Sequence, residues 1–179
     1  MEERIGLYIG RFQPFHKGHK SVVREALIRC DRLVIAVGSA TESRTKKNPF
    51  SYCERIEIIR RSLKGMAEKV IFVPVPDRLL YGDDPSWGQY VLNCVEEYCG
   101  LRPVVNFEGK EACRSTWFDG IDIERVIIDR EITPCSATEV RKALIEDNVE
   151  AFYIRMATGV WIKYDILRKI ILEVENGQD

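Results

Sequence analysis

Short apolar runs alternate along this chain with segments whose apolar residues recur at helical spacing. The run Ile5–Ile9 stops at Gly10, and the run Leu33–Val37 stops at Gly38. Residues 19–29, between the two runs, have the periodicity of an amphipathic helix. Because a crossover helix joins strands that lie parallel, this alternation predicts a βαβ unit at the start of the chain.

The same alternation continues along the chain and predicts an α/β fold: a Rossmann-like open parallel sheet of about five strands with helices on both faces. The other expected strands are 70–75, 104–107 and 126–128, and the other expected helices are 51–63, 87–98, 137–146, 151–155 and 160–174. With 179 residues, against the roughly 150 typical of a domain, we expect a single domain. It comprises an α/β core at 1–147 and a C-terminal helical segment at 148–179. Sheets of this kind bind ligands beyond the carboxyl ends of their strands.

Charge and cysteine usage exclude several classes of protein. The 27 Lys and Arg nearly balance the 28 Asp and Glu, for a net charge of −1, which argues against nucleic acid as a partner. No apolar run approaches the roughly 20 residues that cross a bilayer, and no secretory signal opens the chain, so we expect a cytoplasmic protein with no membrane partner. The six cysteines have no C-x-x-C spacing, which favours reduced thiols over a zinc site.

The only two histidines, His16 and His19, lie in the stretch Gly10-Arg-Phe-Gln-Pro-Phe-His-Lys-Gly-His19. Any chemistry that needs imidazole must therefore use this one place. The stretch follows a predicted strand and opens a predicted helix, whose free N–H groups and positive dipole end favour an anion such as phosphate. The fingerprints G-x-G-x-x-G and G-x-x-x-x-G-K-[ST] are absent. A structural interpretation stays open, in which His16 packs and His19 lies at the helix start.

A second polar segment precedes the helix expected at 137–146. Ser136 or Thr138 would cap this helix, and Arg141 falls one turn inside it. Amides, hydroxyls and a forked guanidinium would then face one anion. The alternative for Arg141 is an ordinary surface ion pair with a neighbour such as Glu139.

Three blocks of the sequence resemble a known family. Residues 10–19 resemble the H-x-G-H signature of the nucleotidyltransferase superfamily, in the extended form of the archaeal-type nicotinamide mononucleotide (NMN) adenylyltransferases. Cys135-Ser-Ala-Thr-Glu-Val-Arg141 resembles the second signature, I-S-[GST]-T-x-[IV]-R, with Ala137 as a departure. Gly38-Ser-Ala40, Asn48-Pro-Phe-Ser51 and Glu54-Arg55 are similar to G-S-A…N-P-F-[ST]-x-x-E-R. Phe107-Glu-Gly-Lys-Glu111 departs from the archaeal S-G-N-P and is closer to the G-x-x-K-D of bacterial relatives. The resemblance predicts the nucleotidyltransferase fold.

The resemblance also implies a reaction, in which ATP and NMN give NAD and pyrophosphate. It places His16 and His19 around the α-phosphorus of ATP and Arg141 and Lys47 on the β- and γ-phosphates. Mg²⁺ would bridge these phosphates without side-chain ligands. The other residues expected to bind ATP are Gly10, Arg11, Phe12, Lys17, Gly18, Ser136 and Thr138. Relatives form homo-oligomers, often hexamers.

The acceptor site follows from the same resemblance. Trp87 corresponds to a tryptophan that stacks on nicotinamide in relatives, and Asp77 and Phe15 are expected near this ring or a ribose hydroxyl. The alternative for Trp87 is core packing between its helix and the sheet. Trp117 and Trp161 are interpreted as core or subunit contacts.

Two other classes of function remain open. One is an adenylyl- or cytidylyltransferase with another acceptor, such as nicotinate mononucleotide, flavin mononucleotide (FMN), phosphopantetheine or glycerol phosphate. The other is a non-catalytic nucleotide sensor, against which the intact His16, His19 and Arg141 argue. The loops 41–49 and 77–86 lack periodicity and are candidates for mobile segments that cover a ligand.

Overall fold

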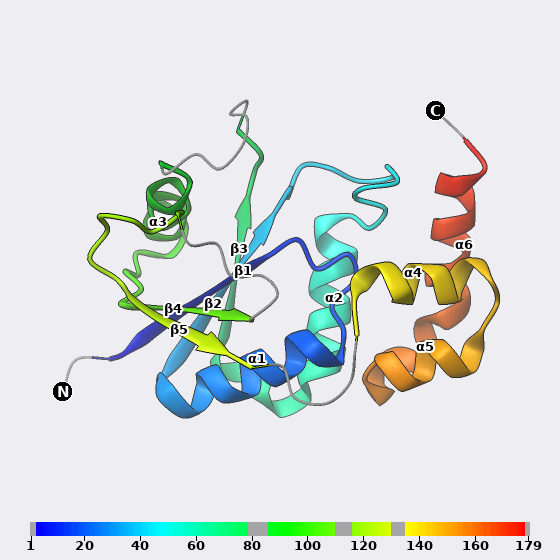
Figure 1. Ribbon diagram of the computed structural model, residues 1–179, viewed down its shortest axis with the longest axis horizontal. Helices are drawn as coiled ribbons and strands as arrows, with labels where there is room; N and C mark the ends of the chain where they lie inside the picture. Colours follow the sequence, from blue (N-terminus) through cyan, green and yellow to red (C-terminus); the bar gives the residue numbers. More distant parts are fainter. Residues whose placement is uncertain (1–2, 79–85, 110–115, 130–134, 178–179) are drawn as a thin grey trace. The chain divides into compact units, whose positions relative to one another are not determined.

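The computed structural model of the protein describes residues 3–78, 86–109, 116–129 and 135–177. Five parallel strands form one sheet in the order β3-β2-β1-β4-β5 (Figure 1). The strands are β1 (Ile5–Gly10), β2 (Arg32–Gly38), β3 (Val70–Val75), β4 (Val105–Gly109) and β5 (Glu124–Ile128). The predicted parallel sheet is therefore confirmed, with small shifts at the strand ends.

The predicted helices are also present, with one correction. The α-helices are α1 (Lys17–Arg29), α2 (Tyr52–Leu63), α3 (Ser86–Cys99), α4 (Ala137–Ile145), α5 (Val149–Arg155) and α6 (Tyr164–Glu175), and the 3-10 helices are η1 (Lys64–Lys69) and η3 (Thr158–Lys163). The single helix expected at 160–174 is wrong at its start, because the chain forms η3 first and α6 begins only at Tyr164. Gly159 lies directly against the backbone of Arg61. The glycine and the β-branched residues at this point also have a low propensity for the α-helix. None of the described helices has both the length and the apolar composition needed to cross a membrane.

The contacts divide the chain into two compact units that interleave along the sequence. Unit 1 contains residues 1–10, 22–40 and 68–130, and unit 2 contains residues 11–21, 41–67 and 131–179. The sheet and α3 belong to unit 1, whereas α2, α4, α5 and α6 belong to unit 2. The single-domain organisation with a boundary after residue 147 remains a prediction.

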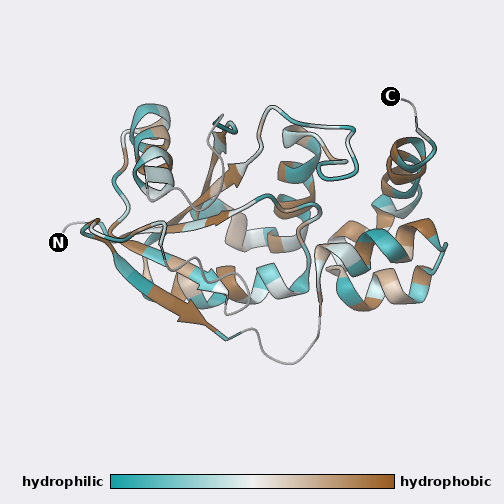
Figure 2. Ribbon diagram, turned by 45° about the horizontal axis from the view of Figure 1, so that its top comes forward, coloured by the Kyte–Doolittle hydropathy of each residue, from teal (hydrophilic) through white to brown (hydrophobic). Residues whose placement is uncertain are grey.

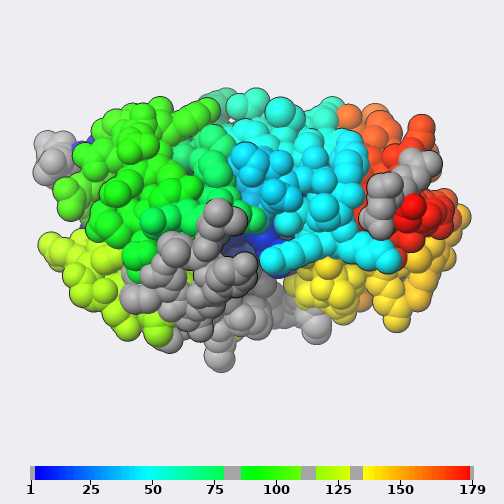
Figure 3. Space-filling view, turned by 90° about the horizontal axis from the view of Figure 1, so that it is seen from above, coloured from blue at the N-terminus to red at the C-terminus, as the bar shows by residue number. Residues whose placement is uncertain are grey.

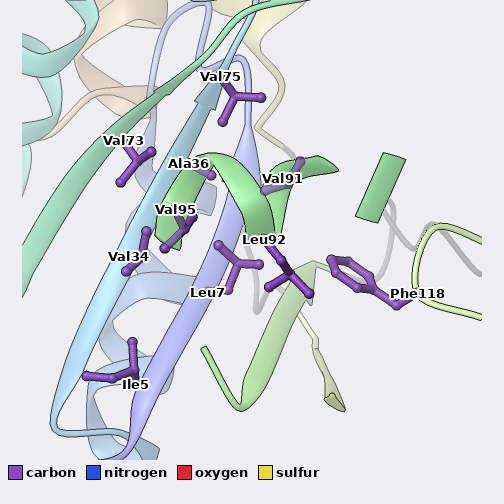
Figure 4. Packing of buried hydrophobic residues seen from close by; sticks show 10 residues of the cluster. All are labelled: Ile5, Leu7, Val34, Ala36, Val73, Val75, Val91, Leu92, Val95 and Phe118. Carbon is purple, nitrogen blue, oxygen red and sulfur yellow. The ribbon is translucent and has the colours of Figure 1, made fainter. Parts of the chain in front are cut away.

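Unit 1 is built on a sheet whose central strands are buried on both faces. Alternate residues of β1, β2 and β3 meet α3 in one core cluster (Figure 4), formed by Ile5, Leu7, Val34, Ala36, Val73, Val75, Val91, Leu92, Val95 and Phe118. On the opposite face Leu33 and Ile35 are fully buried, and a Cβ on Gly6 would overlap with Phe107 and Cys30. The strands are accordingly apolar along much of their length (Figure 2), as is typical of parallel sheets.

Unit 2 packs its helices around aromatic side chains. Helix α4 contacts both α5 and α6 (Figure 1), and the ring of the buried Phe152 meets the edge of Tyr164 at 5.1 Å between centroids. Burial raises the pKa of Tyr164 to about 12, so its hydroxyl stays protonated and donates to Asp147 at 2.8 Å. Trp161 stacks on Tyr153 with 4.5 Å between centroids, in agreement with its interpretation as a core contact.

Candidate active site

The loop that follows β1 has a strained backbone at the first motif. Strand β1 ends at Gly10, and Phe12 has a φ of +54°, in the left-handed region that bulky side chains rarely adopt. The buried Phe12 ring lies 5.6 Å from the ring of Phe15 and 5.1 Å from that of His19. Backbone strain of this kind persists where the surrounding packing enforces it, often at ligand sites. Phe15 is fully buried in the same cluster, and its contact with a substrate remains a prediction.

The backbone holds His16 and His19 in one tautomer. Their ring centroids lie 3.8 Å apart. Nδ1 of His16 accepts a hydrogen bond from the N–H of Gly18 at 3.1 Å, and Nδ1 of His19 accepts one from the N–H of His16 at 3.2 Å. An imidazole that accepts at Nδ1 carries its proton on Nε2. Each ring therefore carries its proton on Nε2, the tautomer that suits donation to a phosphate oxygen.

Gly18 lets two motifs approach each other closely. A Cβ at this position would lie 3.1 Å from the His16 ring and 3.5 Å from the carbonyl oxygen of Cys135. Helix α1 begins at Lys17, so Nδ1 of His16 caps its first turn where a serine or aspartate oxygen is more usual. The helix expected at 19–29 begins two residues earlier than predicted, and the second motif borders its start.

The guanidinium of Arg141 contacts the first motif. It donates from Nη1 to the carbonyl oxygen of Gln13 at 2.6 Å and from Nη2 to Oγ1 of Thr138 at 3.4 Å. Burial lowers the pKa of Arg141, and the positive charge of Arg11 lowers it further, against the opposite effect of Glu175. A bound anion would offset both effects, because it favours the charged guanidinium.

The N-terminus of α4 is capped as predicted, by Ser136. Its Oγ accepts from the N–H of Glu139 at 3.2 Å, and its N–H donates to Oε2 of Glu139 at 2.9 Å, which forms a capping box. Glu139 also pairs with Arg155 at 3.4 Å, so it does not form the surface ion pair considered for Arg141. The Ser136 hydroxyl donates to Glu139 at 3.1 Å and would have to turn to meet a phosphate.

Lys47 belongs to the loop between β2 and α2, whose base is fixed by an ion pair. Arg44 donates to both carboxylate oxygens of Glu54, at 2.6 and 2.7 Å. Lys47 is exposed, and the described residues give its ammonium no partner, while Lys46 lies 4.0 Å from Glu175 of α6. Figure 3 shows this loop, light blue to cyan, beside the yellow and red helices of its own unit. Mobility of the loop remains a prediction, and most of the other loop expected to be mobile, 79–85, lies outside the described residues.

Lys17, predicted to bind ATP, donates hydrogen bonds to the end of α5. Its ammonium donates to the carbonyl oxygens of Tyr153 at 3.2 Å and Ile154 at 2.7 Å, at the end of α5. A phosphate contact for Lys17 remains a prediction.

Trp87 and Asp77, predicted for the second substrate, both belong to unit 1. The Trp87 ring lies 5.3 Å from Tyr90 and 5.6 Å from Trp117 and packs on the core, in agreement with the packing interpretation. Its Nε1–H is buried without a hydrogen-bond partner among the described residues. Asp77 follows β3 and accepts a hydrogen bond from Oγ of Ser39 at 3.0 Å. Both positions leave a function in ligand binding open.

Two buried residues connect the motifs and had no predicted role. The side chain of Gln13 donates to the carbonyl of Phe50 and accepts from its N–H, both at 2.9 Å. The fully buried Arg55 donates to the carbonyl of Arg11 at 2.9 Å. Both residues lie inside the sequence blocks that resemble the family. That position could have indicated a structural role, because a buried polar side chain commonly has a hydrogen-bond partner.

Known proteins are similar to this chain in sequence and in fold. The family model of cytidylyltransferase-like proteins matches residues 7–143. The chain belongs to this family. The nicotinamide-nucleotide adenylyltransferase of Thermococcus onnurineus is 32% identical over 145 residues, which cover 79% of this chain and 72% of that protein. That of Saccharolobus solfataricus is 47% identical over 89 residues, covering 48% and 50%.

A solved structure from Francisella tularensis is similar to this chain. A bifunctional NMN adenylyltransferase/ADP ribose pyrophosphatase, complexed with AMP and a manganese ion, superposes with a TM-score of 0.73 at 22% identity, over 98% of this chain and 52% of that one. The predicted nucleotidyltransferase fold and the resemblance to archaeal NMN adenylyltransferases are confirmed. This chain spans about half the length of some curated relatives that it matches.

Proposed function

We propose that this protein transfers the adenylyl group of ATP to NMN, giving NAD and pyrophosphate. The observation that carries the proposal lies within unit 2, where His16 and His19 carry their protons on Nε2 and the guanidinium of Arg141 donates to a carbonyl oxygen of the same motif. Donors of this kind at the start of a helix suit a triphosphate. Curated relatives named nicotinamide-nucleotide adenylyltransferase support NMN as the acceptor.

The proposed reaction requires little proton transfer. The phosphate of NMN has a second pKa of about 6, so it is largely a dianion at neutral pH. One of its oxygens attacks the α-phosphorus of ATP in line, and the bond from that phosphorus to the bridging oxygen breaks with its electrons leaving on pyrophosphate. The protein must bring two polyanions together and stabilise the charge that develops. His16 and His19 would donate to the α-phosphate, and Arg141, Arg11 and Lys47 to the leaving group.

Mg²⁺ is the proposed companion of ATP. The side chains of the site are imidazole, guanidinium, ammonium and hydroxyl groups, whereas Mg²⁺ prefers oxygen ligands such as carboxylates and phosphates. The triphosphate oxygens therefore suit the ion better than these residues do, and the bound ion would neutralise part of their charge. The manganese ion and AMP in the Francisella tularensis structure support a divalent metal that accompanies the nucleotide.

The remaining predicted site residues have proposed places in the same reaction. Gly10 and Gly18 would let ATP approach the backbone, and Phe12, Ser136 and Thr138 would border it. Trp87 would stack on the cationic pyridinium ring, because the face of an indole attracts a cation. Asp77 would lie near this ring or a ribose hydroxyl, and Phe15 would also contact NMN.

The proposed setting is the cytoplasm, and the proposed assembly is a homo-oligomer such as a hexamer. The five described cysteines, Cys30, Cys53, Cys94, Cys99 and Cys135, are free thiols, as is usual in a reducing compartment. Sedimentation velocity of the purified chain measures the assembly directly.

An assay with several acceptors tests the proposed function. The protein is incubated with Mg²⁺, ATP and one acceptor at a time, which is NMN, nicotinate mononucleotide, FMN or phosphopantetheine. Each reaction is repeated with CTP in place of ATP, and pyrophosphate release is followed in all of them. We expect the fastest release with ATP and NMN, accompanied by stoichiometric NAD. Preference for another pair of substrates would overturn the assignment to NAD synthesis. No release with any pair would favour a nucleotide sensor.

A further inference from the structure

The ammonium of Lys17 closes the end of a helix. Helix α5 (Val149–Arg155) ends with backbone carbonyls that have no partner within the helix and carry a partial negative charge. Lys17 donates to two of them, those of Tyr153 at 3.2 Å and Ile154 at 2.7 Å. These contacts tie the first residue of α1 to the C-terminal helical segment within unit 2.

The second motif contacts the same helix end. The thiol of Cys135 donates to the carbonyl oxygen of Arg155 at 3.6 Å. Nη2 of Arg155 in turn lies 3.4 Å from Oε1 of Glu139, the residue that caps α4 together with Ser136. The last turn of α5 therefore touches the segment that opens α4.

Cys135 also lies beside the first motif. A Cβ on Gly18 would be in contact with the carbonyl oxygen of Cys135, at 3.5 Å. Burial raises the pKa of the Cys135 thiol, the group that donates to α5. Lys17, Cys135 and Arg155, with the carbonyls of residues 153–155, form what we call the α5 cluster.

We propose that the α5 cluster positions the two phosphate-facing motifs, and that Lys17 is a positioning residue in it and not a ligand of ATP. The ammonium already has two short protein contacts, so a phosphate would have to compete with both carbonyls. By holding the first turn of α1, Lys17 also fixes the N–H of Gly18 that orients His16. Displacements of about 1 Å in such a site cost on the order of 100-fold in rate.

Hydrogen exchange in the protein without ATP tests the cluster independently of any reaction. In Lys17→Met, we expect the amides of residues 153–156 and 135–139 to exchange at least about tenfold faster than in the wild type, because the end of α5 loses its donor. Lys17→Arg, which keeps two donors, should retain most of the protection. Lys169→Met, on the exposed side of α6, is the matched control and should change neither segment. Unchanged exchange in Lys17→Met would overturn the proposal.

Kinetics and ATP binding supply the second arm, which rests on the proposed function. We expect Lys17→Met to lower kcat by about 10- to 100-fold while the Kd for ATP changes less than about threefold. Addition of Cys135→Ala should cost less in the Lys17→Met background than in the wild type, since both act through α5. A Kd raised more than about tenfold with normal exchange would make Lys17 a phosphate ligand and refute positioning. A wild type inactive with every acceptor would refute the proposed reaction, while the exchange experiment would still decide the cluster.

Discussion

Each histidine of the first motif uses its Nδ1 to hold the backbone. Nδ1 of His16 caps α1 through Gly18, and Nδ1 of His19 holds the backbone of His16. The structural interpretation therefore applies to Nδ1, whereas the catalytic interpretation concerns Nε2 and stays a prediction. Substitutions that preserve the Nδ1 contact can separate them.

Asparagine at either position tests this division. In His16→Asn the amide oxygen can accept the N–H of Gly18 as Nδ1 does, but no donor reaches the place of Nε2. We expect normal folding and a kcat at least about 100-fold lower, because a preorganised donor to the developing charge is lost. His19→Asn and His19→Ala should lose activity alike. Near-normal turnover in His19→Asn, with turnover lost in His16→Asn, would show that the role of His19 is only structural. Circular dichroism and pyrophosphate release are the measurements.

At the scale of elements, close packing at two glycines sets how helices meet their neighbours. Gly18 lies in the first turn of α1 against His16, and Gly88 lies in α3 directly against the carbonyl of Trp117. Neither glycine has a positive φ, so space and not backbone conformation requires them. The two sites predict opposite effects on stability.

Gly18→Ala should separate stability from activity. Alanine gains up to about 1 kcal/mol of helix propensity over glycine, but its Cβ would press on the His16 ring at 3.1 Å. We expect an unchanged or higher Tm and a kcat about tenfold lower. Gly65→Ala, where a Cβ meets nothing within 4 Å, is the control and should retain activity. A full kcat for Gly18→Ala would show that the His16 position is not critical.

Gly88→Ala should destabilise unit 1. A Cβ would overlap with the carbonyl oxygen of Trp117, so α3 or the segment of Trp117 must move. We expect a loss of about 1–3 kcal/mol in the free energy of unfolding, typical of overpacking. Because Trp87 is the preceding residue, the KM for NMN should rise more than that for ATP. Urea denaturation and steady-state kinetics measure the two effects, and equal stability with an unchanged KM would contradict the prediction.

At the scale of the whole molecule, the positive and negative charges of the chain nearly cancel. The net charge is −1, yet Arg11, Arg141, Lys46 and Lys47 all belong to unit 2. Composition therefore excludes a general polyanion binder but not a local phosphate site. Individual ion pairs, such as that of Arg44 with Glu54, also affect the stability of the fold.

Glu54 should make the protein less stable in acid. The hydrogen bonds from Arg44 lower the pKa of Glu54, so this pair stabilises the fold fully above the unfolded value of about 4.3 and loses its effect as pH falls through the lowered pKa. Glu54→Gln keeps a capping side chain but does not titrate. We expect it to cost about 0.5–1 kcal/mol at pH 7 and to approach the wild type near pH 3. Thermal unfolding across this range is the measurement. A constant difference would contradict the linkage, and Glu97→Gln is the control.

Neighbouring residues in the chain were enough to predict the order of strands and helices, the motifs and the helix caps. Periodicities of 2 and 3.6 residues and capping preferences are local, so the strands, most helices and Ser136 as N-cap follow from neighbours in the chain. The start of α6 did not, because Gly159 packs against a residue of α2 far away in sequence.

The partners of the site residues, in contrast, depend on how the whole chain folds. The tautomers of His16 and His19, the link through Gln13 and the contact of Lys17 with α5 all depend on distances between groups that sequence spacing does not fix. Lys17 shows the physical reason most clearly: 137 residues separate it from the carbonyl of Ile154, and only the folded chain brings cation and helix end together. The motif identifies the charged residues, and the fold determines which groups each of them contacts.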